Sequence, residues 1–221
     1  MATAIYFVLD RSGSMYSCVD DTIGGFNSFV DKQKQDNPDG TMSLFLFSDV
    51  VENVYQNKSI KDVENLTKES YFPCGSTSLC DAIGHTIKFA EKDTQNKNKI
   101  VVILTDGFEN TSKKYTKAHI NDLIDHHTPQ WQFVFLAANQ DAIQTASGFG
   151  IAPASAMTFG QQQVGEAFEG LSAAIGRQVT GESQTVEFSG LERARSCAPP
   201  YQPQQQENSP ISPVGIGEIF C

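Results

Sequence analysis

Three short segments, widely separated in the sequence, carry oxygen-bearing side chains of the kind that bind hard metal ions. The first, DRSGS, supplies Asp10, Ser12 and Ser14. The second, GSTS, supplies Thr77, and the third, LTDG, supplies Asp106. Ions such as Mg²⁺ prefer oxygen ligands in near-octahedral geometry. Two carboxylates would balance the charge of a divalent ion, and three hydroxyls would fill further positions without adding charge.

Each segment also has a simpler interpretation. Asp, Ser and Gly are common in turns, and Ser or Asp often precedes the first residue of a helix. Taken alone, DRSGS favours such turn chemistry. We favour a metal site because all three segments fall in a strand–loop–helix pattern that brings them to one place.

The polar residues near these segments are interpreted as local. We expect Glu109 and Asn110 to cap the following helix rather than contact a metal. Asp81 stands where an acid in the first turn favours the helix dipole. The histidines have no ligand spacing and are assigned to surface or packing roles. A zinc site is not predicted, because Cys74 and Cys80 lack the short paired spacings of zinc ligands.

Buried strands position these loops. Continuous apolar runs at 4–9, 99–105 and 131–138 are typical of strands covered on both faces. Shorter strands are expected over 43–48, over 50–55 and near AMTF. Helices are expected over 19–35, near 60–65, over 79–92, over 116–127, shortly after 138 and over about 161–177. This alternation predicts a doubly wound α/β fold, with a mostly parallel sheet and helices on both faces. Ligands of such sheets bind outside the carboxyl ends of the strands, where Asp10 and Asp106 would emerge.

The segments DRSGSM, GSTSLCDAIG and LTDG, in this order, resemble the metal-ion-dependent adhesion site (MIDAS) of von Willebrand factor A-type domains, over roughly residues 3–178. The resemblance implies a doubly wound sheet and an Mg²⁺ ion, in some members Mn²⁺ or Ca²⁺. It assigns the ion to Asp10, Ser12, Ser14, Thr77 and Asp106. It also implies that an acidic side chain of a protein partner completes the coordination. FEN after TDG, and FVFLAANQDA, look most similar to small intracellular bacterial or viral members.

The alternative is an enzyme. Metal-dependent phosphohydrolases of the haloacid-dehalogenase type also place an aspartate after the first strand, here Asp10. They need a second acid two residues later for proton transfer. This chain has Ser12 there, although Ser48 would suit the scheme. No Gly-x-Ser-x-Gly motif, Walker loop or dinucleotide fingerprint is present, so we predict protein binding rather than catalysis.

Composition and charge limit the classes of binding partner and the cellular location that we expect. The 221 residues include 26 acids and 16 bases, for a net charge of −10. This balance disfavours nucleic acid, whose phosphates need clustered Lys and Arg. No apolar run approaches the roughly 20 residues that span a bilayer. Residues 1–4 lack a basic signal region, and five cysteines do not make a disulfide framework. A cytoplasmic protein is therefore predicted.

Two parts are expected along the chain. Residues 1–180 form the metal-binding domain, and residues 181–221 form an extended or flexible tail rich in Pro and Gln. TVEF at 185–188 could add an edge strand. The apolar IGEIFC could dock on this domain or on a partner. Cys221 lacks the three following residues that a prenylation motif needs.

Overall fold

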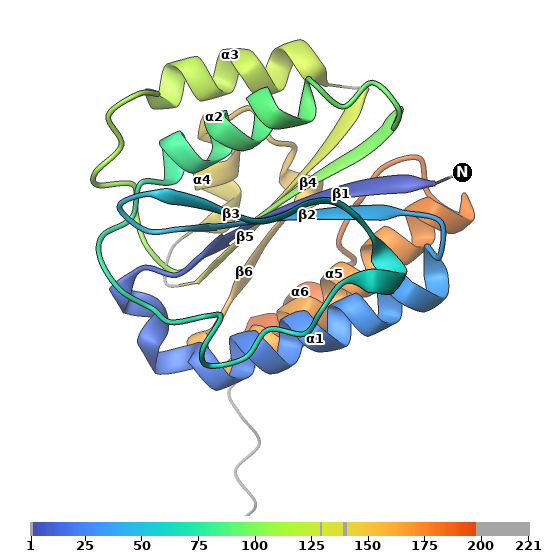
Figure 1. Ribbon diagram of the computed structural model, residues 1–221, viewed down its shortest axis with the longest axis horizontal. Coiled ribbons are helices and arrows are strands. Elements are labelled where there is room, and N and C mark those ends of the chain that lie inside the picture. Colours follow the sequence, from blue (N-terminus) through green and yellow to red (C-terminus); the bar gives the residue numbers. More distant parts are fainter. Residues whose placement is uncertain (1, 129, 139–140, 198–221) are drawn as a thin grey trace, which may run out of the picture.

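The computed structural model describes residues 2–128, 130–138 and 141–197. Within these ranges one sheet has the strand order β3-β2-β1-β4-β5-β6 (Figure 1). The strands are β1 Thr3–Asp10, β2 Thr41–Phe47, β3 Val51–Ser59, β4 Asn98–Thr105, β5 Trp131–Ala138 and β6 Ala156–Phe159. Neighbouring strands are parallel except β2 and β3, which pair antiparallel at one edge.

Helices cover both faces of the sheet (Figure 1). One face carries α1, α5 and α6, and the other carries α2, α3 and α4. The helices in the described ranges are α1 Val19–Asp36, α2 Leu79–Ala90, α3 Lys117–His127, α4 Ala142–Gly148, α5 Val164–Thr180 and α6 Gly190–Cys197. The predicted doubly wound α/β fold is confirmed. No helix in this part of the chain combines the length and hydropathy needed to cross a bilayer.

The central strand β1 shows why its sequence is apolar throughout. All eight of its residues are buried, because successive side chains point to opposite faces and both faces are covered. Phe7 packs against Phe26 of α1 and Phe168 of α5, with ring centroids 5.4 and 5.9 Å away. Tyr6 and Val8 belong to the core on the other face. Burial of each such Phe stabilises the fold by about 2–3 kcal/mol.

The winding of the sheet reverses between β1 and β4. The chain leaves β1 through α1 on one face, and it enters β4 from α2 on the other. The two strands are parallel neighbours, with Leu9 opposite Leu104. Asp10 and Thr105 therefore follow side by side at the carboxyl edge. This is the position at which such sheets bind ligands.

The expected helix near 60–65 is shorter in the structure. Only Ile60–Asp62 forms a 3₁₀ turn, η2, and Val63 is extended. The side chain of Asn27 on α1 holds Leu66 by both backbone groups: Oδ1 accepts from its amide at 2.7 Å and Nδ2 donates to its carbonyl at 3.0 Å. These bonds replace the ones that a continuing helix would make, and they let Val63 and Leu66 enter the core.

The predicted edge strand at 185–188 is not formed. Val186 and Phe188 are buried in the core beside α5. The Phe188 amide donates to the Ala154 carbonyl at 2.9 Å, and the Val186 amide donates to the Gln132 side chain at 3.3 Å. The alternating pattern therefore reflects burial of every second side chain without a strand ladder.

Packed structure continues beyond the predicted boundary at 180/181. Helix α6 packs on α5 and β6, and Arg193 donates hydrogen bonds to backbone carbonyls of the segment 153–156. Residues 190–197 are thus helical rather than extended. The Pro/Gln-rich sequence from 198 onward, with IGEIFC and Cys221, lies outside the described residues.

Four cysteines of the described residues are free thiols. Cys18 and Cys80 are buried and fill space in the core, whereas Cys74 and Cys197 are exposed.

Candidate metal centre

Asp10 is the last residue of β1, and its side chain is fully buried. Oδ1 accepts a hydrogen bond from the Ser12 amide at 2.6 Å, and Oδ2 accepts one from Thr105 Oγ1 at 2.5 Å. The Asp10 carbonyl accepts a third from the Tyr71 hydroxyl at 2.6 Å. A carboxylate offers about four lone-pair positions. Asp10 is therefore held in one orientation and retains capacity for a metal ion.

Two serines connect this carboxylate to the second one. They lie at the start of the 3₁₀ segment η1, Gly13–Cys18, which follows β1. The hydroxyls of Ser12 and Ser14 are 3.1 Å apart, and Ser14 Oγ donates to Asp106 Oδ1 at 2.5 Å. Ser12 and Asp106 are buried, whereas Ser14 is exposed. Four of the five predicted ligands thus form one group that opens to solvent at Ser14.

Thr77 reaches the same group through a close approach at Gly107. A Cβ atom built on Gly107 would lie 2.9 Å from Thr77 Oγ1 and 3.5 Å from Ser14 Oγ. The two hydroxyls therefore both lie next to Gly107, and a Cβ atom at this position would force the Thr77 side chain to shift. Asn110 holds the Thr77 backbone by two hydrogen bonds. The Thr77 amide donates to Asn110 Oδ1 at 3.0 Å, and the Asn110 amide donates to the Thr77 carbonyl at 3.1 Å. All five predicted ligands are brought to one rim.

Glu109 has a different role from the one predicted. It does not cap α3, whose N-terminus is capped by Thr116 through a bond to the His119 amide. Glu109 instead accepts from the Cys80 amide in the first turn of α2 at 2.7 Å, and from the Ser112 amide at 2.7 Å. It therefore ties the loop after β4 to the helix that follows Thr77.

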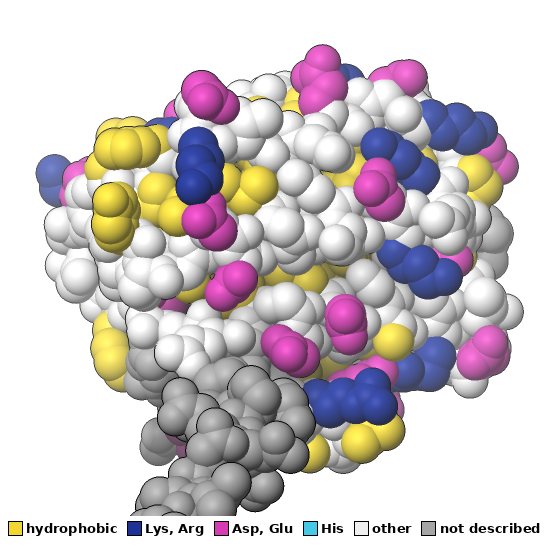
Figure 2. Space-filling view, turned by 90° about the horizontal axis from the view of Figure 1, so that it is seen from below, with side chains coloured by type: hydrophobic (Ala, Val, Ile, Leu, Met, Phe, Trp, Pro, Cys, Tyr) yellow, Lys and Arg dark blue, Asp and Glu magenta, His cyan; other side chains and the backbone are white. Residues whose placement is uncertain are grey.

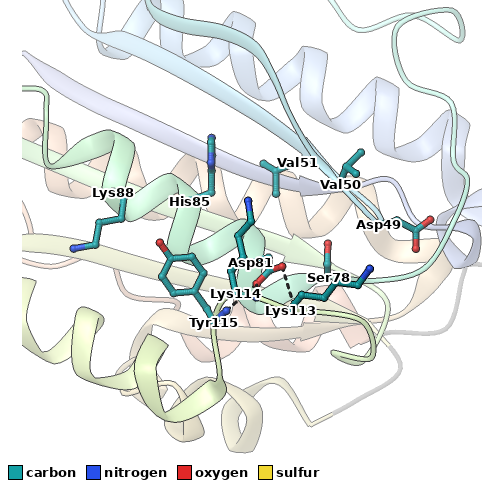
Figure 3. A pocket seen from close by; sticks show the side chains of 10 residues that line it. All are labelled: Asp49, Val50, Val51, Ser78, Asp81, His85, Lys88, Lys113, Lys114 and Tyr115. Atoms are coloured by element: carbon teal, nitrogen blue, oxygen red, sulfur yellow. Dashed lines mark hydrogen bonds between the residues drawn. The ribbon is translucent and has the colours of Figure 1, made fainter.

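Asp81 makes the reciprocal connection, beyond the helix-dipole role expected for it. From the first turn of α2 its carboxylate accepts from the amides of Lys113, Lys114 and Tyr115 at 2.8–2.9 Å. Figure 3 shows these residues around a cavity of about 490 Å³ beside the Thr77 loop. Ser78 lines this cavity, but the five predicted ligands do not. The candidate centre lies on the rim of the sheet, outside this cavity.

The two aspartates carry charge that the protein does not neutralise. Burial raises the pKa of the Asp10 carboxyl to about 6, and burial also raises the pKa of Asp106. Among the described residues neither forms an ion pair with Lys, Arg or His, and Arg11 pairs instead with Glu52 at 2.7 Å. Buried carboxylates without a cation are unfavourable. A divalent ion would supply the missing positive charge.

The donor set fits a hard divalent ion. Two carboxylates and three hydroxyls offer only oxygen, which Mg²⁺, Mn²⁺ and Ca²⁺ prefer. In the described ranges, no group of three or more His, Cys, Asp and Glu side chains is placed to hold a metal. The candidate centre consequently depends on the hydroxyls of Ser12, Ser14 and Thr77.

Sequence reasoning missed three residues that shape the centre. Thr105 and Tyr71 hold Asp10, and Gly107 leaves room for the two hydroxyls. Thr105 and Gly107 flank Asp106 in LTDG, so the motif itself carried a signal for them. Tyr71 lies 61 positions from Asp10, and no local pattern indicates their contact.

Residues 5–109 match the model of the von Willebrand factor type A domain. A search of curated proteins gave no match. Several solved structures share the fold. One is proximal thread matrix protein 1 from the mussel byssus, with a zinc-occupied MIDAS motif. Its TM-score is 0.58 at 16% identity, and the match covers 79% of this chain and 46% of that one.

Two bacterial structures are also similar. PilB minor pilin from Streptococcus sanguinis has a TM-score of 0.59 at 13% identity, covering 83% of this chain and 63% of that one. A von Willebrand factor type A protein from Catenulispora acidiphila has a TM-score of 0.54 at 13% identity, covering 78% and 42%. This chain spans less than half of the mussel and Catenulispora chains. At these identities the likeness shows the fold alone. Residues 5–109 thus match the von Willebrand factor type A domain family, and the chain shares the fold of solved members of that family.

Proposed function

We propose that this domain binds one divalent cation through Asp10, Ser12, Ser14, Thr77 and Asp106, and that the bound ion holds an acidic side chain of a protein partner. Domains of this family typically mediate metal-dependent protein–protein interaction, and one structural neighbour has zinc at its MIDAS. All-oxygen ligands favour Mg²⁺ here, with Mn²⁺ or Ca²⁺ as substitutes.

One observation carries the proposal. Asp10 and Asp106 are buried and have no basic partner among the described residues. They are linked through the Ser12 amide, the Ser12 hydroxyl and the Ser14 hydroxyl. Two such carboxylates balance one divalent ion. When bound, the ion would act as the local positive charge on a protein whose net charge is −10. That charge is what an acidic side chain from another protein would contact.

The place of the centre also favours a protein partner. The ligands lie between loops at the rim of the sheet and open to solvent at Ser14, whereas small-molecule sites are usually concave and enclose most of their ligand. Neither the family match nor the neighbours support the alternative phosphohydrolase built on Asp10. Position 12, where that chemistry needs an acid, is Ser12. A cytoplasmic location remains a prediction from the sequence.

The test is titration of the metal-free full-length protein with Mn²⁺ in a calorimeter. Wild type should bind one ion. Asp10→Asn should bind at least tenfold more weakly, because removal of one charged ligand leaves the ion under-neutralised. Asp21→Asn, an exposed acid in the first turn of α1, is the matched control and should bind as wild type does. Equal Mn²⁺ affinity in wild type and Asp10→Asn would refute the site.

A further inference from the structure

Each of the three loops that carry the candidate ligands also exposes an aromatic side chain. Tyr16 follows Ser14 by two residues and is 70% exposed. Phe108 follows Asp106 by two residues and is 65% exposed, and Phe72, in the loop before Thr77, is 63% exposed. Single exposed hydrophobic residues are normal, but several together mark a contact surface.

This rim is where exposed apolar side chains concentrate. In Figure 2 they gather at the left, the side on which the parallel strands end in Figure 1. Val50, 64% exposed, lies in the turn between β2 and β3 at the same edge. A ligand that fits both the ion and this surface must place large apolar residues next to its carboxylate. Buried aromatic and other large apolar side chains supply much of the affinity of protein interfaces.

The chain itself contains a segment of this kind beyond the described residues. The sequence 198–221 has two acids, Glu207 and Glu218, and no Lys or Arg. Glu207 lies in the polar stretch QQQENSP. Glu218 lies in VGIGEIF, with isoleucines on both sides of it and Phe220 two residues later. Of the two, only Glu218 combines a carboxylate with apolar neighbours.

The described chain ends beside the candidate centre. Near the end of α6, the Ser196 carbonyl accepts from the Gly160 amide at 2.9 Å. Gln161, which follows Gly160 in the chain, donates from Nε2 to Asp106 Oδ2 at 3.4 Å. Gln161 begins the 3₁₀ turn η4, which contacts both α6 and η1. Twenty residues separate Cys197 from Glu218, and a chain of that length can reach at most about 70 Å. Glu218 is thus within reach of the centre in its own chain.

We propose that the segment 214–220 is an internal ligand of the candidate metal centre, with the Glu218 carboxylate on the ion and its apolar neighbours against Tyr16, Phe72 and Phe108. This inference depends on the proposed function, because it requires the ion to be bound. An internal ligand occupies the site until a partner with a better-fitting acidic segment displaces it. The domain is therefore self-inhibited, and its partner carries an acid flanked by large apolar residues.

Metal titration of full-length variants tests the carboxylate. Glu218→Gln should bind Mn²⁺ roughly tenfold more weakly than wild type, as expected when a tethered ligand at an effective concentration on the order of 1 mM is lost. Glu207→Gln removes the other acid of the same stretch and should leave the affinity unchanged. Equal affinities for Glu218→Gln and Glu207→Gln would overturn the internal ligand. If Asp10→Asn still lost Mn²⁺ binding in that case, the proposed function would stand.

A labelled peptide of residues 211–220, ISPVGIGEIF, tests the surface. With Mn²⁺ it should bind the Glu218→Gln protein, and it should bind wild type about tenfold more weakly because the internal segment competes. Phe72→Ser and Phe108→Ser, made in the Glu218→Gln protein, should weaken peptide binding several-fold without changing Mn²⁺ affinity. Peptide binding that persists in EDTA, or that is equal in wild type and Glu218→Gln, would overturn the proposal.

The intramolecular form has its own test. Wild type in Mn²⁺ should remain the same size by gel filtration between low and high micromolar concentration. Mn²⁺-dependent oligomers that disappear in Glu218→Gln would show that the segment binds a second copy instead, and they would overturn the self-inhibited form.

Discussion

The Asp10 carboxylate is buried without a basic partner in the described structure, and burial raises its pKa to about 6. In the unfolded chain its pKa is about 3.9. The folded metal-free protein therefore holds this proton more tightly than the unfolded chain does. The contribution of Asp10 to the free energy of unfolding falls as pH rises between these two values. Above that window the ionised carboxylate destabilises the metal-free fold.

An uncharged side chain at position 10 should therefore stabilise the metal-free fold at neutral pH. At pH 7.5 in EDTA, Asp10→Asn should be more stable to urea than wild type by about 1–3 kcal/mol. The amide fits because Thr105 Oγ1 can instead donate to the Gly107 carbonyl, 3.2 Å away, and accept from Asn. At pH 4.5 the difference should shrink, and saturating Mn²⁺ at pH 7.5 should reverse it. If the variant were less stable in EDTA at pH 7.5, the account of Asp10 as an uncompensated charge would be wrong.

Gly107 leaves the space that the Thr77 hydroxyl occupies at the rim. Its substitution by Ala puts a methyl group 2.9 Å from Thr77 Oγ1, so the Thr77 hydroxyl must rotate away from the rim. We expect Mn²⁺ affinity to fall about tenfold, the effect of losing roughly 1.4 kcal/mol of ligand interaction. Calorimetry measures this. Gly24→Ala on α1, where a Cβ meets nothing within 4 Å, is the control and should bind Mn²⁺ as wild type does.

At the scale of elements, the loops of the centre are held by side chains from other loops and helices. Glu109 receives the amides of Cys80 and Ser112, and Asp81 receives the amides of residues 113–115. The two acids thus lock the start of α2 and the loop after β4 against each other. Such cross-bonding makes the geometry of the rim independent of the metal, as a preorganised site requires.

Removal of Glu109 should loosen both elements. Glu109→Ala leaves the Cys80 and Ser112 amides without their partner, and it should lower the free energy of unfolding by about 1–3 kcal/mol. Faster hydrogen exchange at these two amides would locate the effect. Glu169→Ala, an exposed residue of α5, should change stability by less than about 0.5 kcal/mol. Unchanged exchange at Cys80 would show that Glu109 does not hold α2.

The same residues show what sequence patterns can predict. The apolar runs of β1, β4 and β5 predicted buried strands because burial on both faces leaves a continuous signature. Their order placed Asp10 and Asp106 at one edge without any further information. Glu109 was assigned to the wrong helix because its partner, Cys80, lies 29 positions earlier. Capping patterns describe neighbours in sequence, and they carry no signal for a bond between two loops.

For the whole molecule, the boundary of the domain was the weakest part of the sequence prediction. Composition loses its apolar periodicity after α5, and this suggested a tail from residue 181. In the structure, Val186 and Phe188 are buried in the core, and α6 packs against β6 and α5. Two apolar residues in a polar stretch are too few for a periodic pattern, yet they suffice to anchor the segment. The metal rim and α6 are thereby connected through η4.

The packing of this last segment leads to a prediction about the whole fold. Phe188 is only 6% exposed, so Phe188→Ala should lower the free energy of unfolding by about 3 kcal/mol, through lost burial and the cavity that remains. Leu191, in α6 and 62% exposed, is the matched control, and Leu191→Ala should cost less than about 0.5 kcal/mol. Urea unfolding of both full-length variants measures the difference. A segment that is only a tail would give equally small effects at both positions. A single cooperative transition that shifts for Phe188→Ala would show that residues 181–197 fold together with the metal-binding domain.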